Sequence, residues 1–141
     1  MSNSVSLAIA GGCSALAALA HMTCIVIGPS AYRFMGAGEA MAHAAEAGRW
    51  QPVLLTLMIS ALLAVSAAFA FSAAGLIRPI PFTKLAVAVI TAVYIGRALG
   101  FPLLRPAFPE NSTTFWVISS SICLVIGLLH AHGLWVRWSS I

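Results

Sequence analysis

Four long apolar runs, separated by short segments rich in proline, glycine and charge, constrain what this chain can fold into. They cover about residues 5–28, 52–77, 85–104 and 114–134. About 20 apolar residues in one helix span the roughly 30 Å hydrocarbon core of a bilayer. Inside that core every backbone polar group needs an internal partner, so only helices and closed barrels cross it. Unbroken runs, rather than strict alternation, favour helices over barrel strands.

The shortage of charge supports the same class of protein. Only 7% of the 141 residues are charged and 61% are hydrophobic, whereas about a quarter of the residues of a soluble domain are charged. We therefore expect an all-α membrane protein with a single domain, residues 1–141. Its predicted architecture is an antiparallel bundle of four transmembrane helices, with a short amphipathic or re-entrant helix in the first loop.

The first run must be distinguished from a signal peptide. Residues 1–6 contain no basic side chain, and the apolar run continues beyond the small residues at 18–20 to Ile27. Signal peptides carry a basic N-terminal region and a shorter apolar stretch. We expect a retained transmembrane helix.

The basic residues bear on topology rather than on nucleic-acid binding. The net charge is +4, but Lys and Arg are scattered and form no basic patch, so we expect the lipid bilayer as partner and no nucleic acid. Four spans place the termini and the second loop on one side. That side holds Arg78, Lys84 and Arg137, and the other holds Arg33, Arg49 and Arg105. The count is tied. All three acids lie on the other side, although acids weigh little in this rule, and we predict cytoplasmic termini.

Small residues recur at the spacing of close helix packing, for example Ala8 and Gly12, or Gly11 and Ala15. Such spacings let two helix backbones approach. Packing within the bundle accounts for them, and a homo-oligomer or a membrane-protein partner is left open.

Two ionisable residues stand out at depth within the predicted spans, His21 and Arg97. His21 is 16 residues after Val5, roughly 24 Å along the first helix, and Arg97 is 12 residues after Leu85, roughly 18 Å along the third. These helices run in the same direction, so both side chains fall in the half of the bundle near the first loop. Ionisable groups within a membrane are costly and indicate a functional site.

The first loop lies over that half of the bundle. Glu39, His43, Glu46 and Trp50 are spaced to form one stripe on a helix. We predict a polar cluster, and its candidate ligand-binding residues are His21, Arg33, Glu39, His43, Tyr94 and Arg97. Two interpretations are open. Either Glu39 or Glu46 neutralises Arg97 and holds the loop in place, or the cluster binds a ligand or ion.

Motifs for catalysis or cofactors are missing from the sequence. The three cysteines form no CxxC pair, and the chain contains no aspartate. The Glu-x3-His-x2-Glu spacing at Glu39 lacks a second ligand set from another helix. We predict no metal, no cofactor and no catalytic residue. His130 and His132 are expected near the end of the fourth helix, where protonated histidine favours the helix dipole.

Two segments carry a family resemblance. Tyr32-Arg33-Phe34-x-Gly36-Ala37-Gly38-Glu39 and the later Gly75-Leu76-Ile77-Arg78 make the chain similar to a group of small four-helix bacterial membrane proteins without assigned activity. The resemblance implies a fold and a bacterial inner membrane, and it implies no functional residue.

Three functions are compatible with these features. The first is a non-enzymatic binding or accessory protein with a polar pocket under the first loop. The second is a subunit of an oligomeric transporter or channel. The third is a membrane-embedded enzyme that uses His21 or His43 as acid or base.

Overall fold

The computed structural model describes residues 4–141, and in this range the chain is all-helical, with no strand. The long helices are α1 (Val5–Ile27), α4 (Gln51–Ala74), α5 (Thr83–Leu99) and α7 (Thr113–Arg137). The shorter elements are α2 (Pro29–Phe34), α3 (Glu39–Glu46), α6 (Phe101–Leu104) and the 3-10 helix η1 (Arg105–Ala107). The predicted helical class is confirmed.

Side-chain caps fix where the first and last long helices begin. The Ser4 hydroxyl accepts the N–H of Leu7 at 3.4 Å, and the Ser112 hydroxyl accepts the N–H of Phe115 at 3.0 Å. Such caps satisfy amide groups that have no partner inside the helix.

Three helices, α1, α4 and α7, are long and apolar enough to cross a membrane. A fourth candidate span combines α5 with the α6–η1 segment, which is bent from it by 64°. The bend follows from Gly100 and Pro102, since proline at the second position of α6 has no N–H to continue the helix. The third predicted span, residues 85–104, is therefore wrong as one continuous helix.

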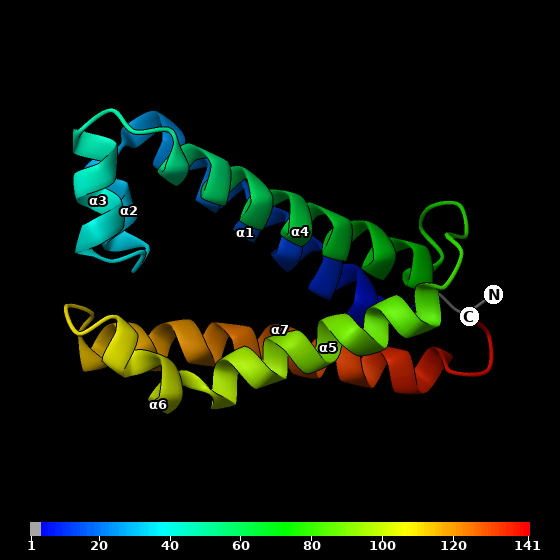
Figure 1. The fold of residues 1–141 in the computed structure, drawn as a ribbon. Coiled ribbons are helices and arrows are strands. Elements are labelled where there is room, and N and C mark those ends of the chain that lie inside the picture. Colours follow the sequence, from blue (N-terminus) through cyan, green and yellow to red (C-terminus); the bar gives the residue numbers. More distant parts are fainter. Residues whose placement is uncertain (1–3) are drawn as a thin grey trace.

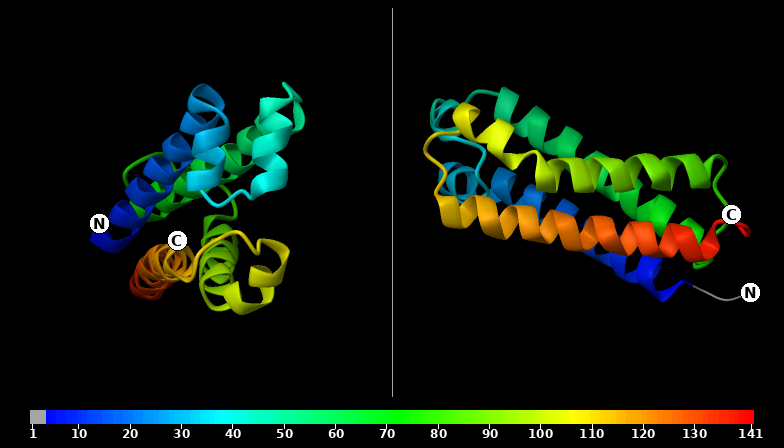
Figure 2. Two further views of the ribbon diagram at one scale, coloured as in Figure 1. Left: turned by 90° about the vertical axis from the view of Figure 1, so that its left-hand side faces the viewer. Right: turned by 90° about the horizontal axis from the view of Figure 1, so that it is seen from below.

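The long helices pack as two pairs, α1 with α4 and α5 with α7. Figure 1 shows the pairs close together near the chain termini and separating towards α2 and α3, and the end-on view in Figure 2 shows one pair lying over the other. Near the termini, Leu7, Val87 and Leu134 form a buried cluster with alanines of α4. The tight end of the bundle thus holds the two pairs together.

Apolar side chains cover the outer surface of the long helices. Leu16 is 67% exposed, Leu62 67% and Val93 64%. Exposed large hydrophobic side chains along whole helices are unfavourable in water and suit a lipid environment. This surface agrees with a membrane protein.

The first loop contains two helices, where the sequence predicted one. Pro29 occupies the first position of α2 after Gly28, which has a φ of +85° that favours glycine. Helix α3 begins at Glu39 and ends at Glu46, so Trp50 is not part of it. Beneath the two helices, Cys24, Tyr32 and Ala42 form a second buried cluster with Ala31.

Candidate functional site

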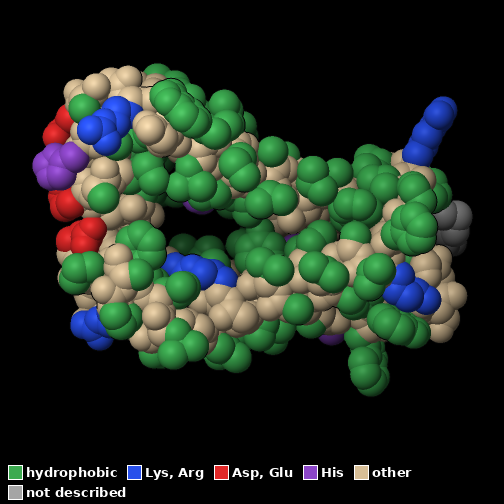
Figure 3. Space-filling view, viewed as in Figure 1, with side chains coloured by type: hydrophobic (Ala, Val, Ile, Leu, Met, Phe, Trp, Pro, Cys, Tyr) green, Lys and Arg blue, Asp and Glu red, His purple; other side chains and the backbone are tan. Residues whose placement is uncertain are grey.

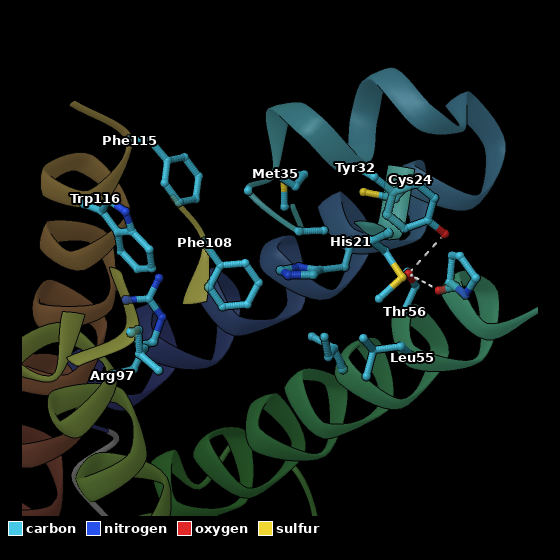
Figure 4. Close-up of a pocket in the computed structure, with 16 residues that line it drawn as sticks. His21, Cys24, Tyr32, Met35, Leu55, Thr56, Arg97, Phe108, Phe115 and Trp116 are labelled. Carbon is cyan, nitrogen blue, oxygen red and sulfur yellow. Dashed lines mark hydrogen bonds between the residues drawn. The ribbon is translucent and has the colours of Figure 1, made fainter. Parts of the chain in front are cut away.

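A cavity of about 320 Å³ lies where the two helix pairs separate, beneath α2 and α3. Figure 4 shows side chains from α1, α2 and α4 on one side of it and side chains from α5, α7 and the loop between η1 and α7 on the other. Its lining residues are mostly apolar and aromatic. Arg97, His21, Tyr32 and Thr56 are the polar ones with ionisable or hydroxyl groups. Cavities of this size and composition are typical of small-molecule sites.

Arg97 lies on one wall of the cavity with no acidic partner. Its Nη2 donates to the Ser119 hydroxyl at 3.5 Å, and its guanidinium carbon lies 5.1 Å from the centre of the Trp116 ring. Its Nη1 is buried without a hydrogen-bond partner. Among the described residues no acidic side chain forms an ion pair with it. The guanidinium therefore keeps donor capacity and an unneutralised charge.

His21 lies on the opposite wall and points towards the cavity (Figure 4). Its Nδ1 donates to the carbonyl of Ala17 at 2.8 Å, one turn earlier in α1. This bond fixes the ring orientation and leaves Nε2 as the ring atom free to interact with a molecule in the cavity. The same wall carries the Thr56 hydroxyl, which donates to the carbonyl of Pro52 at 2.7 Å and is hydrogen-bonded to the Tyr32 hydroxyl at 3.3 Å.

Helices α2 and α3 close the cavity at the loop end. The backbone N–H of Glu39 donates to Glu110 Oε1 at 2.6 Å, and Asn111 Nδ2 donates to the carbonyl of Gly36 at 3.0 Å. A Cβ added at Gly36 would collide with the Phe115 ring. These contacts hold the first loop against the third. We call α2, α3 and the turn between them the lid.

Glu110 is charged in this arrangement. Hydrogen bonds from its own backbone N–H and from that of Glu39 lower the pKa of the Glu110 carboxyl below its ordinary value. The carboxylate also lies at the N-terminus of α3, where negative charge is favoured by the helix dipole. The lid is thus fastened by an ionised group.

The other two acids belong to an ion-pair network on the lid. Arg33 Nε donates to Glu39 Oε1 at 2.9 Å, and its Nη2 donates to Glu46 Oε1 at 2.8 Å. His43 Nδ1 lies 2.8 Å from Glu46 Oε2. Hydrogen bonds with His43 and Arg33 lower the pKa of Glu46, and those to Glu46 and Glu39 raise the pKa of Arg33. The interpretation in which Glu39 or Glu46 neutralises Arg97 is wrong, because Arg33 takes both carboxylates.

Tyr94 lies deeper in the bundle and does not line the cavity. Its hydroxyl is 2.8 Å from the Ser14 hydroxyl, and its ring stacks on that of His130 with centres 5.4 Å apart. His130 is fully buried and its Nδ1 donates to the carbonyl of Ile126 at 2.9 Å. The expectation that His130 stabilises the helix end is wrong, because α7 continues to Arg137 and places His130 two turns inside.

The structure therefore divides the six predicted residues. His21 and Arg97 face one cavity, as their depths predicted. Arg33, Glu39 and His43 form the outer network of the lid, so His43 does not face the cavity, while Tyr94 lies below it. Whether any of the six binds a ligand stays a prediction.

Sequence reasoning missed most of the cavity wall. Trp116 and Tyr32 are absent from the six predicted residues, yet both are buried and line the cavity. Phe108 and Phe115 complete the wall beside Arg97 (Figure 4). The four-residue spacing from Trp116 to the buried Ser120 is a signal that this face of α7 points inward.

Metal ligands do not converge here. Among the described residues no group of three or more histidine, cysteine or acidic side chains is placed to hold a metal ion. The three cysteines are free thiols. The chemistry of the cavity thus depends on one cation, one imidazole, hydroxyl groups and apolar walls.

Comparisons with protein-family models, curated proteins and solved structures give no match to this chain.

Proposed function

We propose that this chain is a four-helix antiparallel protein of a bacterial inner membrane, with its termini in the cytoplasm. The three unbroken apolar helices and the bent α5–α6 segment support four crossings. An even number of crossings agrees with termini at the same end of the bundle, opposite the lid (Figure 1). The proposed bacterial inner membrane rests on the resemblance of the segments around Gly36 and Arg78 to small bacterial membrane proteins.

We propose that its function is non-enzymatic binding of a small ligand that carries negative charge. The observation that carries this proposal is Arg97: its guanidinium lines a cavity, its Nη1 has no partner, and none of the three acids neutralises it. Leaving one buried hydrogen-bonding group unsatisfied costs about 1–3 kcal/mol, and more for a charged group. A bound anion removes that cost, so the cavity is predisposed to take one.

The rest of the cavity suits a ligand with an apolar body. The rings of Phe108, Phe115 and Trp116 and the side chains of Leu55 and Ile59 are part of its lining. Apolar walls with a few convergent polar groups give affinity through burial and orientation through the polar contacts. His21 faces Arg97 from the opposite wall and offers a second polar contact.

Native mass spectrometry of the protein released from membrane nanodiscs tests this function. We expect the wild-type protein to retain a non-covalent adduct that Arg97→Gln loses. Arg49→Gln removes the same charge from an exposed position outside the cavity, so that variant keeps the adduct. Equal adduct populations on wild type and Arg97→Gln, or no adduct on any of the three, would contradict the proposal.

A further inference from the structure

The cavity has two ends of different character. Towards the aqueous end, the lid covers it, held by the Glu110 and Asn111 hydrogen bonds. Towards the side, Figure 3 shows a hollow between the α4 and α5 surfaces, with a Lys or Arg side chain at its edge. Arg97 is the basic residue that lines the cavity. Access from the side therefore needs no rearrangement of the lid.

The side opening is apolar where it would meet lipid. Leu55 of α4 and Leu104 of α6 both line the cavity, and they are 43% and 38% exposed respectively. Leu103, the neighbour of Leu104 in the chain, is 87% exposed. A water-soluble ion gains no binding energy from this apolar opening. An acyl chain, in contrast, can lie across it while the polar end of the molecule reaches into the cavity.

Arg97 lies near the lid end of α5. It is 14 residues after Thr83, roughly 21 Å along α5, and three residues before Gly100, where the helix ends. The lid end is one aqueous end of the bundle, so an amphiphile in the leaflet on that side has its polar end on the same half of the bundle as the guanidinium.

Charge and volume restrict the headgroup. Arg97 supplies one positive charge, which matches a monoanion, and its planar fork matches the two oxygens of a carboxylate. About 320 Å³ is at the lower end of ligand-pocket volumes, so the cavity holds a headgroup and the first part of one chain. The remainder of the chain extends through the side opening into the bilayer.

Resting on the function proposed above, we propose that the ligand is a long-chain carboxylate of the bilayer, of the fatty-acid type. It enters between α4 and α5. Its carboxylate binds the Arg97 guanidinium, facing His21, and its chain leaves the cavity past Leu55 and Leu104.

Quenching of Trp116 fluorescence tests this proposal. Trp50, Trp135 and Trp138 are 66%, 83% and 53% exposed, so replacing these three with phenylalanine leaves Trp116 as a probe of the cavity. The protein is reconstituted in phosphatidylcholine nanodiscs and titrated with a fatty acid brominated close to its carboxyl group. We expect saturable quenching by the acid, and only weak, non-saturating quenching by its methyl ester.

Variants separate charge recognition from partitioning. In the same single-tryptophan protein, Arg97→Gln weakens the saturable phase roughly tenfold or more, as expected for a lost charge-assisted hydrogen bond. Arg49→Gln leaves it unchanged. Leu55→Trp is tested by native mass spectrometry with the unbrominated acid and reduces its binding, whereas Leu54→Trp, one position away and outside the cavity lining, does not.

Three outcomes would overturn the inference. Equal quenching by acid and methyl ester would show that Arg97 does not select a carboxylate. Protection by acetate or inorganic phosphate at the same concentration would identify a soluble anion as the ligand and leave the proposed binding function intact. Saturable quenching by a brominated anionic phospholipid, but not by the fatty acid, would exclude the single-chain class. Circular dichroism and thermal unfolding of each variant confirm that the fold is retained.

Discussion

Arg33 and Arg97 lie at the same end of the molecule, and their surroundings differ. Arg33, whose side chain is 37% exposed, has two carboxylate partners on the lid. Arg97, on the wall of a cavity within the bundle, has a serine hydroxyl and an indole ring. An exposed ion pair contributes little, because water already stabilises the separate charges. The acids are therefore placed where they stabilise the fold least, and the half-buried Arg97 is left without an acidic partner.

The largest expected effect comes from a substitution that places a carboxylate next to Arg97. Ser119 already lies 3.5 Å from Arg97 Nη2, so the carboxylate of Ser119→Glu can reach the guanidinium and replace the ligand. Hydrogen bonds to charged groups contribute about 1.5–3 kcal/mol, so we expect ligand affinity to fall roughly tenfold to a hundredfold. Adduct intensity in native mass spectrometry measures this. Ser119→Gln has the same size without the charge and should lose much less.

The next effect concerns the lid backbone. Gly36 and Gly48 both have positive φ, +74° and +65°, but only Gly36 faces a side chain, the Phe115 ring. Alanine at a positive φ costs about 1–2 kcal/mol at either position. Gly36→Ala should cost more than Gly48→Ala, because Phe115 must also move. Chemical unfolding in detergent measures the difference, and equal losses would show that the lid does not press on Phe115.

A smaller effect is expected from pH. The pKa of Glu110 is lowered in the folded protein, as is that of Glu46. Their stabilisation is therefore complete above the unfolded pKa, ordinarily about 4.5, and is lost as the pH falls through the lower folded pKa. Hydrogen exchange at the Glu39 amide, corrected for its intrinsic rate, should accelerate in that range. Glu110→Gln should remove most of the pH dependence of this exchange. If the pH dependence is unchanged, a contact other than that of Glu110 with the Glu39 amide holds the lid.

The smallest effect is expected at Arg33. Arg33→Gln breaks exposed ion pairs with Glu39 and Glu46, and such pairs are weak and screened by salt. We expect little change in the melting temperature and no change in ligand binding. A loss of binding comparable to that of Arg97→Gln would show that the two arginines act together and not independently.

The depth of each helix residue could be predicted from the sequence, but its partner could not. Counting residues along two parallel helices correctly placed His21 and Arg97 at one level, because helix rise is constant. Which arginine pairs with Glu39 and Glu46 could not be predicted, because it depends on α2. This helix begins at Pro29 and places Arg33 against α3. A single turn of helix in a loop is set by tertiary contacts, which apolar patterning does not reveal.

The direction of a side chain around its helix was equally hard to predict. Tyr94 is three residues before Arg97 on the same helix, yet it packs on His130 and Ser14 below the cavity. Helix α5 is apolar on most of its surface, so its sequence does not distinguish the side that faces α7 from the side that faces lipid. Only the packing of the two helix pairs decides this.

The early end of α5 has a consequence for the membrane itself. Its 17 residues extend roughly 25 Å, less than the 30 Å hydrocarbon core that the other long helices can span. Hydrophobic mismatch of this kind is relieved when the surrounding bilayer thins. We expect lipids beside α5 and α6 to be compressed towards the midplane, so that the protein prefers thin bilayers and distorts thick ones on one flank only.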